Sequence, residues 1–341
     1  MKSNRERIVE TLSSVLEAVD LKEKKNRLSM ALEIIDNDKG FSNFTLRDNI
    51  CHSLDSRGVE RIDYYARKAM DSISMPKVNS VNDLNMSRWK DYPEIITDSL
   101  WNLEKRDRSG GHDASYWGNF IPQIPRQLML RYTKKGDYVI DPFLGGGTTA
   151  LEALRMERNV IGMDINPAAL ETAIKKCEEA LKENNNSSRV HFHNLDSSMA
   201  DYRSILEKDG VEKVKLAILH PPYHDIIRFS NIEGDLSSSP SRGEFISAVG
   251  KVAKNCGKVL EDGGYLALVI GDKYERGEWV PLGFLSMNEI LSSGFSLKSI
   301  VVKNYDVTKA KRGSEELWRY RALVGGYYVF KHEYIFIFKK Q

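Results

Sequence analysis

Residues 137–156 read "DYVIDPFLGGGTTALEALRM" and give the most direct indication of the fold. The stretch opens with a short apolar run typical of a buried strand. Three consecutive glycines at 145–147 then let the backbone turn sharply and approach a ligand closely. Two threonines open a helical pattern whose free amides can face that ligand. A strand, a glycine turn and a helix in this order predict a binding site for a small molecule.

The same stretch disfavours a nucleotide triphosphatase. The phosphate loop of such an enzyme needs a lysine after its glycines, and "GGGTT" at 145–149 has none. The predicted ligand is therefore something other than a nucleoside triphosphate held by that loop.

Six further apolar runs follow, rich in branched side chains. They read "NVIGMDI", "RVHFHNL", "KLAILH", "GYLALVI", "FSLKSIVV" and "EYIFIF". Most are separated by segments with helical periodicity, and strands that alternate with helices pair in parallel. We therefore expect an α/β fold with a doubly wound, seven-stranded, mostly parallel sheet. The connection 303–332, before the last strand, instead looks loop-like, basic and aromatic.

The segment that precedes this sheet has another pattern. To about residue 75, apolar residues recur at helical spacing with polar faces between them. We predict two parts, a mostly helical accessory region at 1–110 and an α/β domain at 111–341. Residues 104–113 are expected to form an exposed loop, and 234–243, "GDLSSSPSRG", a mobile one.

Composition sets the protein class. A chain of 341 residues that is 41% hydrophobic and 29% charged can bury one large core and an accessory region. No apolar run approaches the roughly 20 residues that span a bilayer, and no secretory signal is visible, so we expect a cytoplasmic protein. The net charge of +2 permits a nucleic-acid partner only through a local basic patch.

Cysteine and histidine spacing indicates neither disulfides nor metal. The three cysteines form no CxxC pair, and Cys177 and Cys256 each continue an apolar helical face. His191, His193 and Glu333 lie on expected strands without metal-ligand spacing, so we assign no metal.

Acidic residues end three successive strands. They are Asp141, Asp164 and Asp196. In a doubly wound sheet such residues meet at the carboxyl edge, where an acid at the end of the second strand can accept from a ribose diol. Beside the glycine turn, the set predicts a pocket for an adenosine-containing cofactor.

"DPFLGGGTT", "GMDINP" and "HPPY", in this order, resemble the amino-group DNA methyltransferases that use S-adenosylmethionine. The resemblance covers about residues 116–341, and "WGNFIPQIPRQL" at 117–128 is similar to the segment that closes over the methionine end of the cofactor. It implies the class I methyltransferase, Rossmann-like fold and S-adenosylmethionine as cofactor. Together with the glycine turn and the acids, it assigns cofactor binding to Asn119, Phe120, Ile121, Asp141, Pro142, Phe143, Gly145, Gly146, Gly147, Thr148, Thr149, Asp164, Ile165 and Asp196.

The run "HPPY" at 220–223 suits transfer to an exocyclic amino group. That nitrogen is a poor nucleophile because its lone pair is delocalised into the ring, so acceptors must pull on its protons. A neutral His220 and the carbonyl of Pro221 can do so, and Tyr223 offers a flat wall to a base rotated out of its duplex. The predicted catalytic residues are His220, Pro221, Pro222 and Tyr223, and the rate should fall through a histidine pKa, unperturbed near 6.5.

Two features of this region narrow the chemistry. The family usually has Asp, Asn or Ser where this chain has His220. Enzymes that methylate carbon-5 of cytosine carry a Pro-Cys nucleophile, and no cysteine here follows a proline, which disfavours that reaction. His224 and Asp225 either extend the site or cap the next helix.

A basic and aromatic stretch predicts the nucleic-acid surface. Trp318, Tyr320, Tyr327 and Tyr328 are interleaved with cations that can contact phosphates: Lys303, Lys309, Lys311, Arg312, Arg319 and Arg321. A solvated hairpin is the alternative. We expect the helical region before residue 117 to read the target sequence, aided by this loop.

The main hypothesis is a DNA methyltransferase that acts on a flipped-out base in double-stranded DNA. Adenine N6 is favoured over cytosine N4 because it is the commoner target among similar enzymes. A restriction-modification or defence role would bring a cognate endonuclease as partner. The alternatives are a transfer RNA amino-group methyltransferase and a catalytically silent binding protein.

Overall fold

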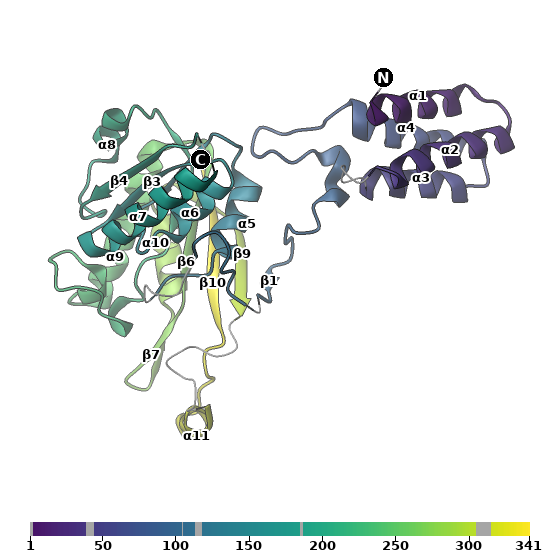
Figure 1. Cartoon of the computed structure of the whole chain (residues 1–341). Helices are drawn as coiled ribbons and strands as arrows, with labels where there is room; N and C mark the ends of the chain where they lie inside the picture. Colours follow the sequence, from purple (N-terminus) through teal and green to yellow (C-terminus); the bar gives the residue numbers. More distant parts are fainter. Residues whose placement is uncertain (1–2, 39–43, 104, 113–117, 185–186, 305–314) are drawn as a thin grey trace. The chain divides into compact units, whose positions relative to one another are not determined.

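The computed structural model describes residues 3–38, 44–103, 105–112, 118–184, 187–304 and 315–341. Contacts between Cα atoms divide the chain into two compact units, Met1–Ile95 and Ile96–Gln341, drawn in Figure 1. Each unit has its own hydrophobic core. Within the described residues, none of the helices is both long and apolar enough to cross a bilayer.

The first unit is helical, as its periodicity predicts. Its elements are α1 (Asn4–Glu17), α2 (Leu21–Asp36), α3 (Phe44–Asp55), α4 (Val59–Ser74) and the 3₁₀ turn η1 (Met86–Asp91). Leu12, Leu28 and Ile50 are fully buried among the apolar faces of these helices. Lys24 is also buried, and its ammonium donates to the Val15 carbonyl (2.7 Å) and to Asp63 (2.6 Å). It thus satisfies carbonyls at the end of α1 from the neighbouring helix.

The second unit is built on an eight-stranded sheet. Its strands are β1 (Leu100–Trp101), β2 (Tyr138–Asp141), β3 (Asn159–Asp164), β4 (Val190–Asn194), β5 (Val214–Leu219), β6 (Leu260–Ile270), β9 (Phe295–Asn304) and β10 (His332–Lys340). Their order is β1-β9-β10-β6-β5-β2-β3-β4, and only β10 is antiparallel to its neighbours. All seven predicted strands are confirmed, and the sheet is doubly wound.

Three short strands carried no sequence signal. β1 has two residues, too few for a period, and pairs in parallel with β9 through Leu100 and Val302. This pairing joins residues 96–103 to the sheet, so the two units part after Ile95, earlier than the expected residue 110. β7 (Lys273–Glu275) and β8 (Glu278–Val280) form a separate hairpin that follows β6.

Helices cover both faces of the sheet. They are α5 (Gln123–Tyr132), α6 (Thr148–Arg155), α7 (Pro167–Asn184), α8 (Tyr202–Asp209), α9 (Arg242–Val259) and α10 (Leu282–Leu291). The unit also contains α11 (Glu315–Gly325) and the 3₁₀ turns η2 (His224–Ile226) and η3 (Leu236–Ser238). α5, α6 and α7 pack in one row, and α8, α9 and α10 in the other. Alternate residues of each strand face opposite rows, so the central strands are buried on both faces.

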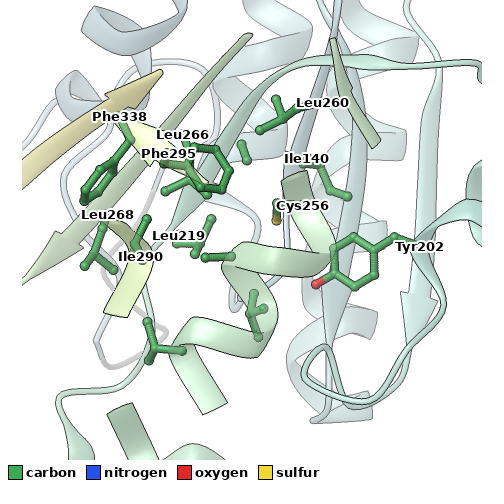
Figure 2. Close-up of a cluster of buried hydrophobic side chains, with 14 of the residues drawn as sticks. Ile140, Tyr202, Leu219, Cys256, Leu260, Leu266, Leu268, Ile290, Phe295 and Phe338 are labelled. Atoms are coloured by element: carbon green, nitrogen blue, oxygen red, sulfur yellow. The ribbon is translucent and has the colours of Figure 1, made fainter. Parts of the chain in front are cut away.

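Figure 2 shows part of the core of this unit, in which Ile140, Leu219, Leu268 and Cys256 belong to one cluster of buried side chains. Cys256 and Cys177 are both buried, as their helical spacing predicts. Burial raises the pKa of the Cys177 thiol to about 12 and raises that of Cys256 as well, which keeps both thiols protonated. Both cysteines are therefore packing residues.

Two expected loops are corrected. Residues 315–325 form α11 inside the connection that looked loop-like, while residues 305–314 lie outside the described residues. The segment 234–243, expected to be mobile, contains η3 and buries Asp235, Leu236 and Ser237. The composition did not indicate this because hydrogen bonds to the buried Asp235 carboxylate help to hold the segment.

The topology collects several segments at one edge. β5, β6 and β9 run in the same direction, since β10 is antiparallel to both β6 and β9. The residues after β5, the β7–β8 hairpin after β6 and α11 after β9 therefore all leave the carboxyl edge of the sheet. Figure 1 shows α11 beyond the ends of β9 and β10.

The glycine turn depends on close packing against α7. Gly147 has φ +85°, and a Cβ there would lie 2.9 Å from the Cβ of Ala173. Gly210, at the end of α8, has φ +69° but open space around it. The two glycines thus share a backbone requirement and differ in packing.

We expect Gly147→Ala to destabilise the protein by about 2–5 kcal/mol, which combines left-handed strain with overpacking. Gly210→Ala, the matched control, should cost only about 1–2 kcal/mol because it adds strain alone. Chemical denaturation of both variants measures the difference. Equal losses would show that the contact with α7 does not constrain the turn.

Candidate active site

Asp141 ends β2 and is fully buried under the glycine turn. One carboxylate oxygen, Oδ1, accepts the amide hydrogen of Phe143 at 2.9 Å. The other oxygen lies near the buried hydroxyl of Thr149, whose interaction opposes part of the rise in the pKa of Asp141, but neither atom makes a hydrogen bond of good geometry among the described residues. Burial raises the pKa of Asp141 to about 7. An unsatisfied buried acceptor of this kind fits a donor supplied by a ligand.

Asp164 ends β3 and binds the turn itself. Its Oδ2 accepts from the Gly145 amide at 2.7 Å, and its Oδ1 accepts from the Asn166 amide at 2.8 Å. Burial raises the pKa of this carboxyl group. The residue therefore has a structural role that its strand-end position did not reveal. A carboxylate has about four acceptor sites, so two remain for a ligand.

Asp196 follows β4 and faces an ordered loop. Its Oδ1 accepts the amide hydrogen of Ser198 at 2.8 Å. A Cβ on Gly234 would lie 2.7 Å from the Asp196 Oδ2 and 3.2 Å from the Cδ1 of Ile165. The segment 226–240 therefore lies against two of the predicted cofactor residues.

Asp235 fixes this segment. Its carboxylate accepts from the Ser230 hydroxyl (2.6 Å) and from the Ser237 amide (2.8 Å), and the side chain of Ser237 accepts from the Phe229 amide. The Phe229 ring packs against Gly118 so closely that a Cβ there would lie 2.6 Å from its Cζ. This loop carried no sequence signal beyond the aspartate in "GDLSSS" at 234–239.

The segment before α5 reaches the catalytic residues. Phe120 is buried, and its ring centroid lies 4.7 Å from that of His220. Asn119 accepts from the Arg106 guanidinium through its carbonyl at 3.1 Å, and the carbonyl of Ile121, just before α5, accepts from the Ile124 amide at 3.1 Å. Of these three predicted cofactor residues, Phe120 also forms one wall of the histidine site.

His220 contacts two aromatic rings. The ring of Tyr223 stands at 90° to it, with the centroids 5.7 Å apart, and the ring of Phe120 is tilted by 54°. Burial lowers the pKa of His220 to about 4, which outweighs the opposing effect of Glu333. The imidazole is therefore neutral at physiological pH, and the acid decline expected near pH 6.5 moves well below it.

A polar chain extends from His220 away from the cofactor residues. The Nε2 of His220 lies 3.4 Å from the Tyr223 hydroxyl, which donates to the Oε2 of Glu333 at 2.7 Å. The Oε1 of Glu333 pairs with the Lys303 ammonium at 3.0 Å. Glu333 on β10 and Lys303 on β9 are directly opposite each other in the antiparallel pairing of these strands. Sequence reasoning considered Glu333 only as a metal ligand and missed this contact between distant segments.

Lys303, which the sequence predicted to contact phosphate, lies instead inside the protein. It is only 5% exposed and is held by Glu333 beneath the catalytic edge. Its position in a basic stretch suggested a solvent-facing cation, but the stretch still belongs to β9 at this residue.

Pro221 is buried and Pro222 half-buried, and the chain then turns away through η2. His224 has φ +53° and lies with its Nδ1 2.9 Å from the ammonium of Lys273. Asp225 accepts from the same ammonium at 2.6 Å. Both residues thus fasten the turn after Tyr223 to the β7–β8 hairpin, and neither caps a long helix.

The expected nucleic-acid residues fall into two groups. Arg319 and Arg321 are exposed on α11, and the Arg321 guanidinium covers the Trp318 ring at 5.2 Å. Lys309, Lys311 and Arg312 lie outside the described residues.

The aromatic residues of this region are only partly exposed. Tyr327 stacks on Tyr274 of the β7–β8 hairpin, with ring centroids 4.1 Å apart, and Phe330 packs on Trp279 at 4.2 Å. These contacts join the hairpin to the chain after α11. Tyr320 and Tyr328 are 64% and 87% exposed, so aromatic surface remains open at this edge.

His191 and His193 both contact Asp209, at 3.3 Å and 2.8 Å. Among the described residues, no three histidines, cysteines or carboxylates gather as a metal site would require.

Comparison with known proteins gives a family match. A family model described as DNA methylase, for the N6/N4 type, matches residues 18–175 and 214–341. The match begins inside the helical unit, before the motifs that resemble amino-group methyltransferases.

Curated relatives match shorter parts of the chain. The type II methyltransferase M.Cfr9I of Citrobacter freundii is 31% identical over 80 residues, 24% of this chain and 25% of that protein. M.MjaII of Methanocaldococcus jannaschii is 33% identical over 116 residues, 31% of this chain and 22% of that protein. A tRNA (guanine(10)-N2)-dimethyltransferase of the same organism is 26% identical over 181 residues, 51% of this chain and 46% of that protein. Each match thus spans less than half of the relative.

We expect the buried Asp141 to make stability pH-dependent in the cofactor-free protein. Its pKa is raised to about 7, so the folded state keeps a proton that the unfolded state, with a pKa near 3.8, has released. Stability should therefore fall as the pH rises from about 4 to 7, by at most roughly 4 kcal/mol. Asp141→Asn should remove this part of the decline.

Thermal unfolding of parent and variant between pH 5 and 8 measures the effect. The difference between the two melting temperatures should grow in favour of the variant with rising pH. Parallel curves would mean that Asp141 does not carry the proton.

Proposed function

We propose, from the premise that the chain belongs to the N6/N4 DNA methylase family, that it moves a methyl group from S-adenosylmethionine to the exocyclic amino group of a base in DNA. The observation that carries the proposal is the neutral His220 at the end of β5, directly before Pro221, Pro222 and Tyr223. It presents a ring-nitrogen acceptor at the sheet edge where Asp141 and Asp164 end β2 and β3.

The cofactor residues fit S-adenosylmethionine. The unsatisfied oxygen of Asp141 suits a donor such as an ammonium group, and the free acceptor sites of Asp164 suit ribose hydroxyls. Asp196 and Ile165 lie at the next strand ends, where the loop 226–240 covers them. When bound, the cofactor supplies an electrophilic methyl group on a sulfonium sulfur.

The chain's own residues activate the nucleophile. His220 and the Pro221 carbonyl accept hydrogen bonds from the two N–H groups of the amino nitrogen. These bonds return lone-pair density to the nitrogen as it attacks. An amino nitrogen that receives the methyl group would have to lose one proton. His220 can take that proton because its ring is neutral before the reaction. Tyr223 offers its ring to the flipped base.

Adenine N6 remains the favoured acceptor over cytosine N4, on the family resemblance alone. The substrate we propose is double-stranded DNA in the cytoplasm, and the curated relatives named type II methyltransferases support a restriction-modification setting with a cognate endonuclease. The helical unit would read the target sequence.

The DNA surface is proposed at the carboxyl edge. α11 follows β9, which runs parallel to β5, so Arg319, Arg321 and the exposed Tyr320 leave the sheet on the same side as His220. Cations and open aromatic rings beside a catalytic edge suit phosphates and displaced bases.

A second candidate substrate is transfer RNA. The relative named as a tRNA dimethyltransferase matches 51% of this chain, more than the two DNA relatives described above. The same activation by His220 would serve the amino group of guanine.

Incubation with labelled S-adenosylmethionine and either mixed-sequence duplex DNA or transfer RNA tests the function. We expect label in DNA, on adenine N6 by nucleoside analysis, and none with His220→Ala. Label only in RNA would replace the substrate class. Cofactor binding without transfer to either would favour the silent binding protein and overturn the proposal.

The pH profile should reflect the buried histidine. Because its pKa is lowered to about 4, single-turnover methylation at saturating cofactor should stay nearly level from pH 5.5 to 8. His220→Asn, which also offers a neutral acceptor, should keep part of the rate with the same level profile. A parent rate that halves near pH 6.5, while the Asn variant stays level, would show that the ring titrates as if exposed.

Replacing both Arg319 and Arg321 by Ala should weaken DNA binding across sequences and flatten its salt dependence. Each lost phosphate contact lowers the log–log slope by roughly 0.9. The matched control is Arg189→Ala, since Arg189 is exposed beside the start of β4, at the opposite edge of the sheet. A slope that changes equally in both proteins would place the DNA elsewhere.

A further inference from the structure

We propose that Glu333, acting through the Tyr223 hydroxyl, holds His220 in the tautomer with its proton on Nε2, so that Nδ1 is the nitrogen offered to the substrate amino group. The role of Nδ1 rests on the proposed function, whereas the tautomer is a property of the protein alone. Glu333 and the Tyr223 hydroxyl are then positioning groups, because they act through His220 and not on the base.

The direction of the hydrogen bonds follows from chemistry. A carboxylate has no proton to give, so the 2.7 Å contact requires that Tyr223 donates to Glu333. The hydroxyl proton is then used, and only the oxygen lone pairs remain for His220. At 3.4 Å the Nε2 of His220 can therefore act only as a donor to Tyr223, which leaves the lone pair on Nδ1.

Lys303 determines which oxygen of Glu333 faces Tyr223. Its ammonium, which can only donate, lies 3.0 Å from Oε1, while Oε2 receives the tyrosine proton. Lys303 is buried with the pair, so the arrangement is held within the protein. The sequence distance of 110 residues between Tyr223 and Glu333 is closed by the pairing of β10 with β6, which parallels β5.

The bond count of the side chains agrees with Nδ1 as the acceptor. Nδ1 is attached directly to Cγ, at the same place as the Oδ1 of asparagine or aspartate, the residues that the family resemblance leads one to expect at position 220. Nε2 lies one atom farther, at the place of the Oε1 of glutamine. The hydrogen bond to Tyr223 uses Nε2, and Nδ1 remains available to the base.

The tautomer can be observed directly by ¹⁵N NMR of protein labelled in its 7 histidines, with the His220 signals identified by their loss in His220→Asn. We expect a protonated Nε2 and an unprotonated Nδ1 in the parent. Tyr223→Phe should allow a mixture of both tautomers. A parent with its proton on Nδ1, or a Tyr223→Phe spectrum identical to the parent's, would overturn the proposal whether or not any methylation is found.

Glu333→Gln should reverse the network. The Lys303 ammonium will hold the amide oxygen, which turns the amide NH₂ toward Tyr223. The hydroxyl then accepts from the amide and donates to Nε2 of His220, and Nδ1 acquires the proton. The variant should bind cofactor like the parent, show the inverted NMR pattern, and methylate roughly tenfold more slowly or worse, since one activating hydrogen bond is replaced by two opposed donors.

The double variant Tyr223→Phe/Glu333→Gln is the control. It has no hydroxyl to relay the reversal, so its rate should rise above that of Glu333→Gln and approach that of Tyr223→Phe. Losses that simply multiply would overturn the relay and leave Glu333 as a packing residue. If Glu333→Gln does not fold, the spectrum of Tyr223→Phe still decides the tautomer.

A pair of amide variants tests which nitrogen acts on the substrate. His220→Asn places an acceptor at the Nδ1 position and should retain part of the methylation rate. His220→Gln places it at the Nε2 position and should retain much less. The opposite order would assign the substrate to Nε2 and overturn the second half of the proposal.

Discussion

The carboxylate of Asp164 supports most of what lies at the catalytic edge. By accepting from the amides of Gly145 and Asn166, it joins the end of β3 to the turn that follows β2. The turn in turn covers the buried carboxylate of Asp141 and starts α6 against α7. A ligand in this site would meet a backbone already fixed by the protein, so little ordering free energy would be lost on binding. Asp164 thus serves the glycine turn and would serve a bound ligand, and its substitution would disturb both.

The sequence predicted the sheet well because its signals are local. Seven apolar runs, the glycine turn and the strand-end acids each occupy a few consecutive residues, and parallel pairing follows from the helices between them. β1 was not predicted because its two residues are too few to show a period. The loop 226–240 was not predicted because its anchor is Asp235, whose buried carboxylate accepts from the Ser230 hydroxyl and the Ser237 amide, and a run of small polar residues does not reveal such bonds.

The catalytic residues show the same division. His220 and Tyr223 belong to one short motif and could be read from it, whereas Glu333 and Lys303 lie on the β10 and β9 strands and meet Tyr223 only through sheet order. The lowered pKa of His220 likewise arises from surrounding side chains, Phe120 among them, that no local pattern brings together. Lys303 was misread for the opposite reason, since a basic stretch gave it a surface role that its strand position denies.

The position of β10 divides the sheet into two blocks. Within the described residues, β9 pairs only with β1 and β10, so the block β1-β9-β10 meets the remaining strands through the single ladder between β10 and β6. Glu333 and Lys303 belong to that block, while the glycine turn and the strand-end acids belong to the other. Opening of this one ladder would separate Glu333 from Tyr223 and leave β2, β3 and β4 paired. Hydrogen exchange along β10 would therefore report how often this ladder opens and Tyr223 loses Glu333, separately from the pairing of β2, β3 and β4.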